Sequence, residues 1–345
     1  MNSGSFPAES AKSPAAQTGF RQQLEAWREL LARCGRKPGR KCVHALRVAT
    51  LRLQAELEFG LDKQPAAQGL NAARRLRRQG KKLRRALGPV RQADVYLGKL
   101  KRVRGWAGTE ANGHPACPAE CTNAIDRLAR SFGSRRDDAA KTLVAEIKRR
   151  HKRLGKLSRK AEPAFDAFAL AAESGASDKI VERIRAAASE FPELDAGNLH
   201  EFRKRIKKIR YLADIFGRTD EGAARQADTL RRMTGAVGEW HDWQALAAEA
   251  RKAAGERGAM KMLADCLEAQ AGRAFEHALQ LCRRSMRQLL REKTEDKITR
   301  DPDLSAEALE KLPEDSNRKP IARKSVASVP AEFQNVELKR SVRAS

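Results

Sequence analysis

Two segments of the chain, 156 residues apart, carry the same spacing of polar residues on an apolar background. The first reads VHALRVATLRL over residues 43–53, and the second reads LHEFRKRIKKIRY over residues 199–211. In each segment an apolar residue precedes a histidine, an arginine follows three residues after the histidine, and a basic residue stands eight after it. An internal repeat of this kind predicts two similar structural units, so it restricts the fold more than composition does.

Both segments have the apolar periodicity of an amphipathic helix. The two predicted apolar stripes are Val43, Leu46, Thr50, Leu53 and Leu57, and Leu199, Phe202, Ile206, Ile209 and Phe216. In the second segment the polar residues fall in one row on the neighbouring face: His200, Arg203, Lys207 and Arg210. At about 1.5 Å per residue this row is about 15 Å long, which matches an extended line of negative charges better than one small anion.

The rest of the chain also favours helix. Ala, Leu, Arg, Lys and Glu dominate, and runs of β-branched residues are missing. Turn-forming residues predict breaks at residues 35–39, 60–68, 88–89, 106–118, 175–178, 192–198 and 217–222. The longest stretch, residues 119–160, is compatible with one helix or two. We therefore predict an all-α fold.

Charge is the strongest compositional signal. The chain has 70 Lys and Arg against 44 Asp and Glu, and the net charge of +26 predicts a polyanionic partner. Beyond residue 295 there are ten basic and nine acidic residues and little apolar periodicity, so we predict a disordered tail over 294–345. Residues 1–15 are predicted to be disordered as well. The charge therefore belongs to the folded part, residues 16–293.

Two helical stretches are unusually basic. Residues 74–85 contain eight cations and no acid: Arg74, Arg75, Arg77, Arg78, Lys81, Lys82, Arg84 and Arg85. The second stretch is 148–153, extended by Lys156, Arg159 and Lys160. Because like charges four residues apart oppose helix formation, the first stretch indicates an anion that compensates the repulsion.

Together these elements resemble the CHAD domain, the conserved histidine α-helical domain. The family pattern has His-x-x-Arg-Val followed by a basic pair, then a Leu-Gly-x-x-Arg-Asp stretch, and a second copy with His-x-x-Arg-Lys that ends in Arg-Tyr. Residues 44–48 match the first element, residues 200–204 the second copy, and residues 210–211 its ending. Leu87-Gly88 with Arg91, and Gly238 with Asp242, match the downstream stretch.

The resemblance covers about residues 16–293 and implies two helical bundles related by a pseudo-twofold axis, over about 16–175 and 176–293. Long antiparallel helices would surround a basic central cavity that binds inorganic polyphosphate. With the basic run included, the expected binding residues are His44, Arg47, Arg52, Arg74, Arg78, Lys81, Lys82, Arg85, Arg91, His200, Arg203, Lys204, Lys207, Lys208, Arg210 and Tyr211. The resemblance also implies association with polyphosphate granules.

Two positions depart from the family pattern. Leu51 stands where a basic residue is usual, and Gln92 stands where an aspartate is usual, although Asp94 is nearby. We therefore expect the first half to bind somewhat more weakly or to depend more on residues 74–85.

Several site residues have a second interpretation. At a phosphate, the two arginines would make bidentate contacts and the two histidines would donate hydrogen bonds. The histidines could instead be structural, and the arginines could pair with Asp94 or Asp242. Tyr211 could cap an anion or pack in the core.

For the whole chain, the alternative function is nucleic-acid binding without sequence specificity, because the net charge suits that partner too. Against it, no DNA-reading motif is present, and aromatic residues make up only 5% of the chain. Nucleic acid is thus expected as a weaker competitor of polyphosphate. There is no run of 18 apolar residues and no signal-peptide pattern, so we expect a cytoplasmic protein without a membrane span.

Catalytic signatures are missing from the sequence, including a phosphate-binding Gly-rich loop, a nucleophile elbow and clustered carboxylates for a metal. We expect a binding protein without a cofactor rather than an enzyme. The six cysteines should be free thiols. His114, Cys117 and Cys121 could be zinc ligands, but no second pair follows at finger spacing, and we expect no metal there.

Overall fold

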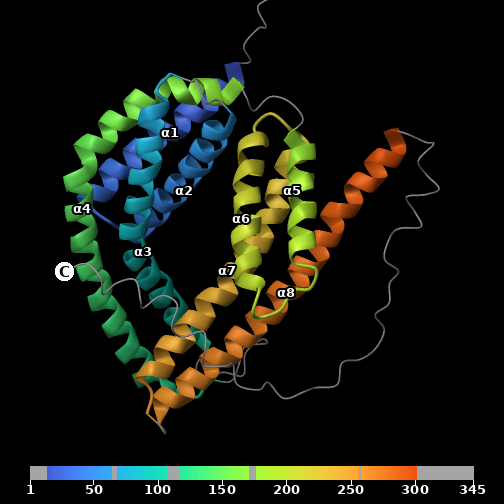
Figure 1. Ribbon diagram of the computed structural model, residues 1–345. Helices are drawn as coiled ribbons and strands as arrows, with labels where there is room; N and C mark the ends of the chain where they lie inside the picture. Colours follow the sequence, from blue (N-terminus) through green and yellow to red (C-terminus); the bar gives the residue numbers. More distant parts are fainter. Residues whose placement is uncertain (1–13, 64–67, 107–116, 171–175, 256–257, 301–345) are drawn as a thin grey trace, which may run out of the picture. The chain divides into compact units, whose positions relative to one another are not determined.

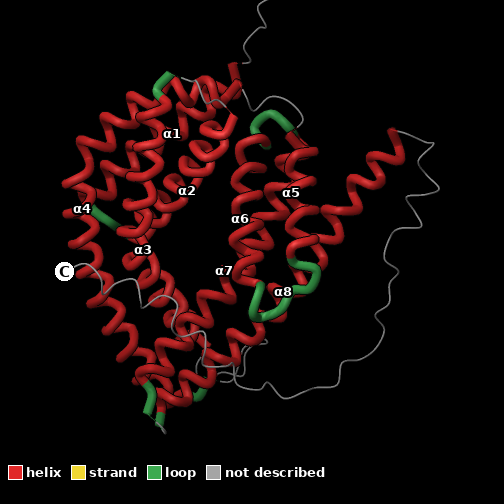
Figure 2. The backbone as a smooth tube through the Cα atoms, in the orientation of Figure 1, coloured by secondary structure: helices red, strands yellow, loops and turns green. Residues whose placement is uncertain are grey.

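The computed structural model describes residues 14–63, 68–106, 117–170, 176–255 and 258–300 (Figure 1). These residues form helices and short loops, and the described part of the chain contains no strand (Figure 2). Residues 1–13 and 301–345, where most of the predicted disorder falls, lie outside the described residues; residues 294–300 belong to the last helix. The chain divides into two compact units, residues 1–295 and 296–345, and all the expected binding residues lie in the first.

Two sets of four helices follow one another along the chain, and in each set two shorter helices precede two longer ones. The first set is α1 (Pro14–Arg36), α2 (Arg40–Lys63), α3 (Leu70–Trp106) and α4 (Thr122–Leu170), with a short 3-10 turn, η1 (Ala119–Cys121), before α4. The second set is α5 (Ala176–Glu190), α6 (Leu199–Phe216), α7 (Glu221–Ala253) and α8 (Ala259–Arg300). The histidine elements lie in α2 and α6, the second helix of each set. This arrangement confirms the predicted all-α fold.

Most of the predicted helix breaks are present, but the one at residues 88–89 is wrong. Helix α3 continues through Gly88 and Pro89 as far as Trp106. A proline inside a helix removes one hydrogen bond and costs about 3 kcal/mol. On either side of it Leu87 and Val90 are fully buried, so tertiary packing on this face outweighs that local cost. Residues 122–170 form one helix, although Pro163 lies inside it.

One break was not predicted. Helices α7 and α8 are separated near Gly255 and Gly258, and Gly258 has a φ of 94°, which favours glycine.

The predicted apolar stripes form the core around the histidine helices. Leu46 on α2 and Phe202 on α6 are at most 1% exposed, and the main hydrophobic cluster includes residues from all eight helices. Thr50 is also fully buried, and its hydroxyl accepts a hydrogen bond from Trp27 Nε1 at 3.0 Å and donates one to the Leu46 carbonyl at 2.7 Å. The stripe prediction is thereby confirmed.

A second hydrophobic cluster joins the distal parts of the long helices. It packs the C-terminal parts of α3 and α7 against the N-terminal parts of α4 and α8. Trp106 and Trp243 meet there, with ring centroids 5.9 Å apart.

Near the main cluster the two histidine helices contact each other across the halves. Phe59 at the end of α2 and Phe216 at the end of α6 pack edge to face, with centroids 5.2 Å apart. The packing therefore brings the polar rows of α2 and α6 into one region.

Candidate anion-binding site

Each histidine helix is tied to the long helix that follows it by the arginine of its His-x-x-Arg element. Arg47 Nη1 donates to the backbone carbonyl of Arg84 at 3.3 Å, and Arg203 Nε donates to the backbone carbonyl of Thr234 at 3.4 Å. These two carbonyls each lie four residues before a glycine of the downstream element, Gly88 or Gly238. Because a guanidinium has five N–H donors, one such bond orients the side chain and leaves most donors for another acceptor.

The two glycines have different surroundings. A methyl group added to Gly238 would lie 3.0 Å from Arg203 Nη2, so a larger residue there would require the guanidinium to shift by a few tenths of an ångström. A methyl group on Gly88 would meet nothing within 4 Å. The repeated glycine therefore has a packing role in the second half that it does not have in the first.

A group of cations from both halves converges on Lys207. Burial, as the largest cause, and then the charges of Arg203, Arg47, Arg210 and Arg84 together lower the pKa of its amine to about 7. These side chains come from α2, α3 and α6, and we call this group, including Lys207, the cation cluster. It combines the predicted polar row with residues that are far away in the sequence.

Carboxylates do not neutralise most of this cluster. Among the described residues, Arg47, Arg84, Arg203 and Lys207 have no carboxylate oxygen within 4.0 Å. Arg210 is the exception: its Nε lies 3.7 Å from Asp214, and its Nη1 donates to the Thr234 hydroxyl at 3.3 Å. Repulsion between partly buried cations is costly, so the cluster has an unmet preference for an anion.

The structure decides between the alternatives for the two arginines. Asp94 is buried and pairs with Arg136 at 3.1 Å, so it is not the partner of Arg47. Asp242 lies close enough to affect Arg203 electrostatically, but the two do not form an ion pair within the described part of the chain.

Asp242 is the acidic member of the site. Burial raises the pKa of this carboxyl group, while Lys99, Arg203 and Arg91 lower it. Two of these cations, Lys99 and Arg91, belong to α3 of the first half. Asp242 therefore helps to hold cations from both halves, consistent with the orienting role expected for the downstream element.

Both histidines are surrounded by cations. Desolvation lowers the pKa of His44, and Arg91 is the next largest cause. Desolvation also lowers the pKa of His200, followed by the charge of His241, whose ring centroid lies 4.9 Å away. Both imidazoles therefore stay neutral at a lower pH than an ordinary histidine, until an anion offsets these charges.

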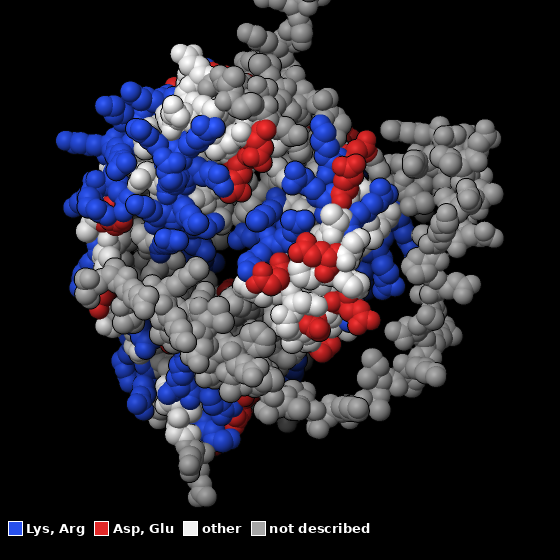
Figure 3. Space-filling model, viewed as in Figure 1, with Lys and Arg blue, Asp and Glu red and all other residues white. Residues whose placement is uncertain are grey.

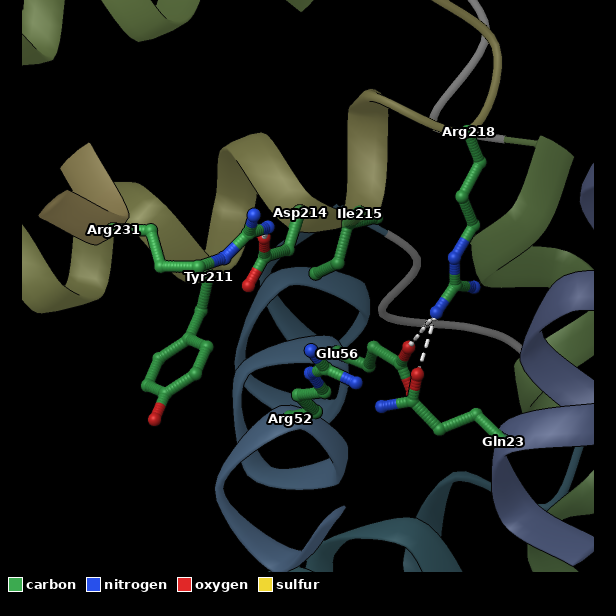
Figure 4. Close-up of a pocket in the computed structure, with 8 residues that line it drawn as sticks. All are labelled: Gln23, Arg52, Glu56, Tyr211, Asp214, Ile215, Arg218 and Arg231. Carbon is green, nitrogen blue, oxygen red and sulfur yellow. Dashed lines mark hydrogen bonds and ion pairs between the residues drawn. The ribbon is translucent and has the colours of Figure 1, made fainter. Parts of the chain in front are cut away.

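Tyr211 lies next to this cluster with its ring buried. The guanidinium of Arg210 is 4.3 Å from the ring centroid, and burial raises the pKa of the phenol. Packing against the Arg210 guanidinium agrees with the core role that was left open, and Tyr211 also lines the neighbouring pocket (Figure 4).

That pocket has a volume of about 210 Å³ and lies between α1, α2 and the α6–α7 region. Figure 4 shows Arg218 reaching Glu56 and Gln23 across it, with Nη2 distances of 2.9 and 2.6 Å. Glu56 is fully buried, and burial raises the pKa of its carboxyl group to about 7 despite the charge of Arg218. This pair joins the two halves beside the cation cluster, and Arg52 lines the same pocket.

The other expected binding residues lie around this centre. Arg91 is partly buried and electrostatically coupled to His44 and Asp242. Lys204 pairs with Glu201, and Lys208 is exposed. The remaining expected residues are exposed on α3 and do not appear among the charges that shift the cluster: Arg74, Arg78, Lys81, Lys82 and Arg85.

Arg84 belongs to the cluster but was missing from the expected binding residues. A signal for it exists in the sequence, because Arg84 stands seven residues before Arg91 and helical periodicity puts both on one face. His241 and Thr234 were also missed, and both depend on how α7 packs against α6.

The proposed zinc ligands do not form a described metal site. His114 lies outside the described residues, while Cys117 and Cys121 are buried free thiols, as are the other four cysteines. Within the described ranges no three His, Cys, Asp or Glu side chains are grouped to hold a metal ion. None of the described helices has the length and apolar character that crossing a membrane requires.

Comparison with known proteins agrees with this architecture. The family model described as the CHAD domain matches residues 15–251. The chain belongs to the CHAD domain family. No curated protein matches the chain.

Two solved structures are similar to this CHAD domain. One is the crystal structure of the CHAD domain from the plant Ricinus communis, with 18% identity, a TM-score of 0.49, and coverage of 89% of this chain and 94% of that chain. The other is PptA from Streptomyces chartreusis, with 15% identity, a TM-score of 0.50, and coverage of 80% and 98%. At this identity, the likeness to PptA supports the fold.

Proposed function

We propose that this CHAD domain binds inorganic polyphosphate at the cation cluster and acts by binding rather than by catalysis. The observation that carries the proposal is the convergence of Arg47 and Arg84 from one half with Arg203 and Lys207 from the other, without carboxylate partners among the described residues. Such a group favours a ligand of high negative charge density.

The donors in the cluster suit phosphate. Each arginine keeps free N–H groups that can contact two oxygens of one phosphate. Because Lys207 has a pKa of about 7, an anion next to it would stabilise the protonated amine and draw a proton from solvent. His44 and His200 would respond in the same direction.

The extent of the site favours a polymer over a single phosphate. The row from His200 to Arg210 spans about 15 Å along α6, and Arg47 and Arg84 extend it across the boundary between the halves. Polyphosphate has no bases to stack, and Tyr211 is the aromatic residue that packs against a cation of the cluster. The family resemblance implies the same ligand, and binding of this kind would place the protein at polyphosphate granules in the cytoplasm.

The decisive test is a competition at fixed, near-physiological salt. Long-chain polyphosphate, duplex DNA and RNA are compared as competitors of a labelled polyphosphate, at equal phosphate concentration. We expect polyphosphate to compete best, because a flexible chain can adapt to a cluster of cations from three helices and a stiff duplex cannot. Tighter binding of DNA or RNA would overturn the proposal in favour of the nucleic-acid alternative. The protein is also incubated with polyphosphate alone. Release of orthophosphate would contradict the proposal that the domain binds polyphosphate without hydrolysing it.

A further inference from the structure

A second basic surface lies outside the cation cluster, where α3 and α4 pack antiparallel. Two contacts set their register: Arg150 Nη1 donates to Gln79 Oε1 at 2.7 Å, and Arg136 Nε lies 3.1 Å from Asp94 Oδ1. The first half of α3 therefore runs along the second half of α4, which brings the two basic stretches of the sequence side by side.

Exposed cations flank this helix pair. Arg75 and Lys82 lie in one helical row with Gln79, and Arg153 lies one turn beyond Arg150. We define the outer face by its exposed residues on α3 and α4: Arg75, Arg78, Lys82, Arg149, Arg153, Lys156 and Lys160. Figure 3 shows Lys and Arg side chains covering the molecule where the upper part of α4 lies in Figure 1.

The outer face is almost without acids. No Asp or Glu occurs in residues 69–93 or 147–161. Glu146 pairs with Arg149 at 2.7 Å, but Lys82, Arg153 and Lys156 have no ion pair among the described residues. The equivalent face of the second half has less positive charge, because Arg231 pairs with Asp214 and with Asp228.

The outer face is continuous with the cation cluster around α3. Arg84 reaches the cluster, while Lys81, Lys82 and Arg85, which are its neighbours along the helix, point to successive exposed directions. The exposed surface of this part of α3 is thus cationic from the cluster side to the α4 side. A flexible anion that leaves the cluster at Arg84 meets further cations at each step.

We propose that the outer face of α3 and α4 is a second polyphosphate-binding track, which makes the domain selective for long chains. This inference rests on the proposed function of the cation cluster. A short polyphosphate chain fills the cation cluster only, whereas a long chain also occupies the outer face. Binding in the cluster holds the rest of a long chain close to the outer face, and this high effective concentration favours the second contact.

The shape of the path favours polyphosphate over a duplex nucleic acid. The chain must turn from the cluster around a single helix, which with side chains is about 10–12 Å in diameter. Duplex DNA has a persistence length of about 50 nm and cannot bend on that scale at acceptable cost. The outer face also lacks exposed aromatic residues that would stack on the bases of a single strand.

The test compares two triple variants with the same change in charge on the same two helices. The outer-face variant carries Lys82→Gln, Arg153→Gln and Lys156→Gln. The control variant carries Lys101→Gln, Arg127→Gln and Arg130→Gln, which are exposed at the other ends of α3 and α4. Affinity for tripolyphosphate and for a chain of about 100 phosphates is measured for both variants and the unmodified protein, with helicity checked by circular dichroism.

We expect the outer-face variant to lose on the order of tenfold in affinity for the long chain and less than about twofold for tripolyphosphate. For the long chain, a plot of log affinity against log salt concentration should be less steep for this variant, by about one unit of slope for each lost phosphate contact. The control variant should bind both probes nearly as the unmodified protein does.

The possible failures are distinguishable. If the unmodified protein binds neither probe, the proposed function itself is wrong. If it binds both, but the outer-face variant loses no more for the long chain than the control does, the track is wrong and the cluster stands. Binding of a single-stranded RNA is measured for the same three proteins. If the outer-face variant loses RNA binding and keeps long-chain polyphosphate binding, the surface belongs to a nucleic acid and the inference is overturned.

Discussion

The two halves of the domain share one arginine contact but differ in the charge around it. At an offset of 150 residues, Arg84 in α3 corresponds to Thr234 in α7, and both backbone carbonyls accept from the arginine of the histidine helix. The same offset aligns Arg78 with Asp228. The backbone geometry is therefore repeated, while the side chains of α3 add positive charge and those of α7 remove it.

This difference separates two tasks. The second half is tightly packed around Arg203, with Gly238 at close approach and Asp242 nearby, so it positions donors. The first half exposes unpaired cations along α3, so it contributes attraction over a longer range. The proposed binding in the cluster would use both halves, which leads to four predictions in order of decreasing effect.

The largest effect should come from the two arginines that make the shared contact. We expect Arg47→Ala and Arg203→Ala each to lower polyphosphate affinity by on the order of tenfold, and the double variant by about 100-fold, because charge-assisted hydrogen bonds contribute about 1.5–3 kcal/mol each. Titration calorimetry measures the losses, and circular dichroism shows whether the helices remain. An intact double variant with unchanged affinity would show that the cluster is not the binding site.

The second effect is a pH dependence centred on Lys207, whose pKa of about 7 lies below its usual value. A bound anion raises this pKa, so above pH 7 binding must take up a proton and affinity should fall, by on the order of tenfold between about pH 7 and 8.5. Stability of the free domain should change in the opposite direction. The unfolded chain binds the proton more tightly, so this group makes unfolding costlier as pH rises from about 7 towards 10.5.

Lys207→Arg separates this group from others that titrate. An arginine stays charged over the whole range, so the variant should lose most of the pH dependence of affinity above pH 7. Lys208→Arg, at the exposed neighbouring position, should keep it. If Lys207→Arg retains the full pH dependence of affinity, that dependence arises from another titrating group.

The third effect tests the different packing at the two glycines. Both lie inside helices, where alanine is favoured over glycine by about 0.5–1 kcal/mol. Gly88→Ala should raise the melting temperature and leave affinity unchanged. Gly238→Ala should displace Arg203, gain less stability and lower affinity by about threefold to tenfold. Equal effects of the two changes would contradict the proposed division of tasks.

The smallest effect concerns a matched pair of exposed cations, Lys81 on α3 and Arg231 on α7. Arg231 is already paired, at 2.9 Å from Asp214, so Arg231→Gln should change polyphosphate affinity by less than about twofold. Lys81 has no ion pair among the described residues, so Lys81→Gln should weaken binding by about twofold to fivefold. The comparison fails if the α7 change costs more than the α3 change under the same salt conditions.

The sequence determined the helical class, the two apolar stripes and the repeated His-x-x-Arg elements, because all of these follow from a helical period that acts within one segment. It also determined that the positive charge lies in residues 1–295, since residues 296–345 are nearly neutral. The family resemblance rested on the same local patterns.

Only the tertiary structure decided which cations meet. Eight basic residues lie close together on α3, but Arg84 comes near Lys207 while Arg74 and Arg85 remain exposed, because α2 packs against one face of α3 and Arg47 contacts the Arg84 backbone there. The same packing pairs Asp94 with Arg136 rather than with Arg47, and keeps α3 helical through Pro89. Helical periodicity determines which residues share a face of a helix. Which other helix that face packs against depends on contacts between residues that are far apart in the chain.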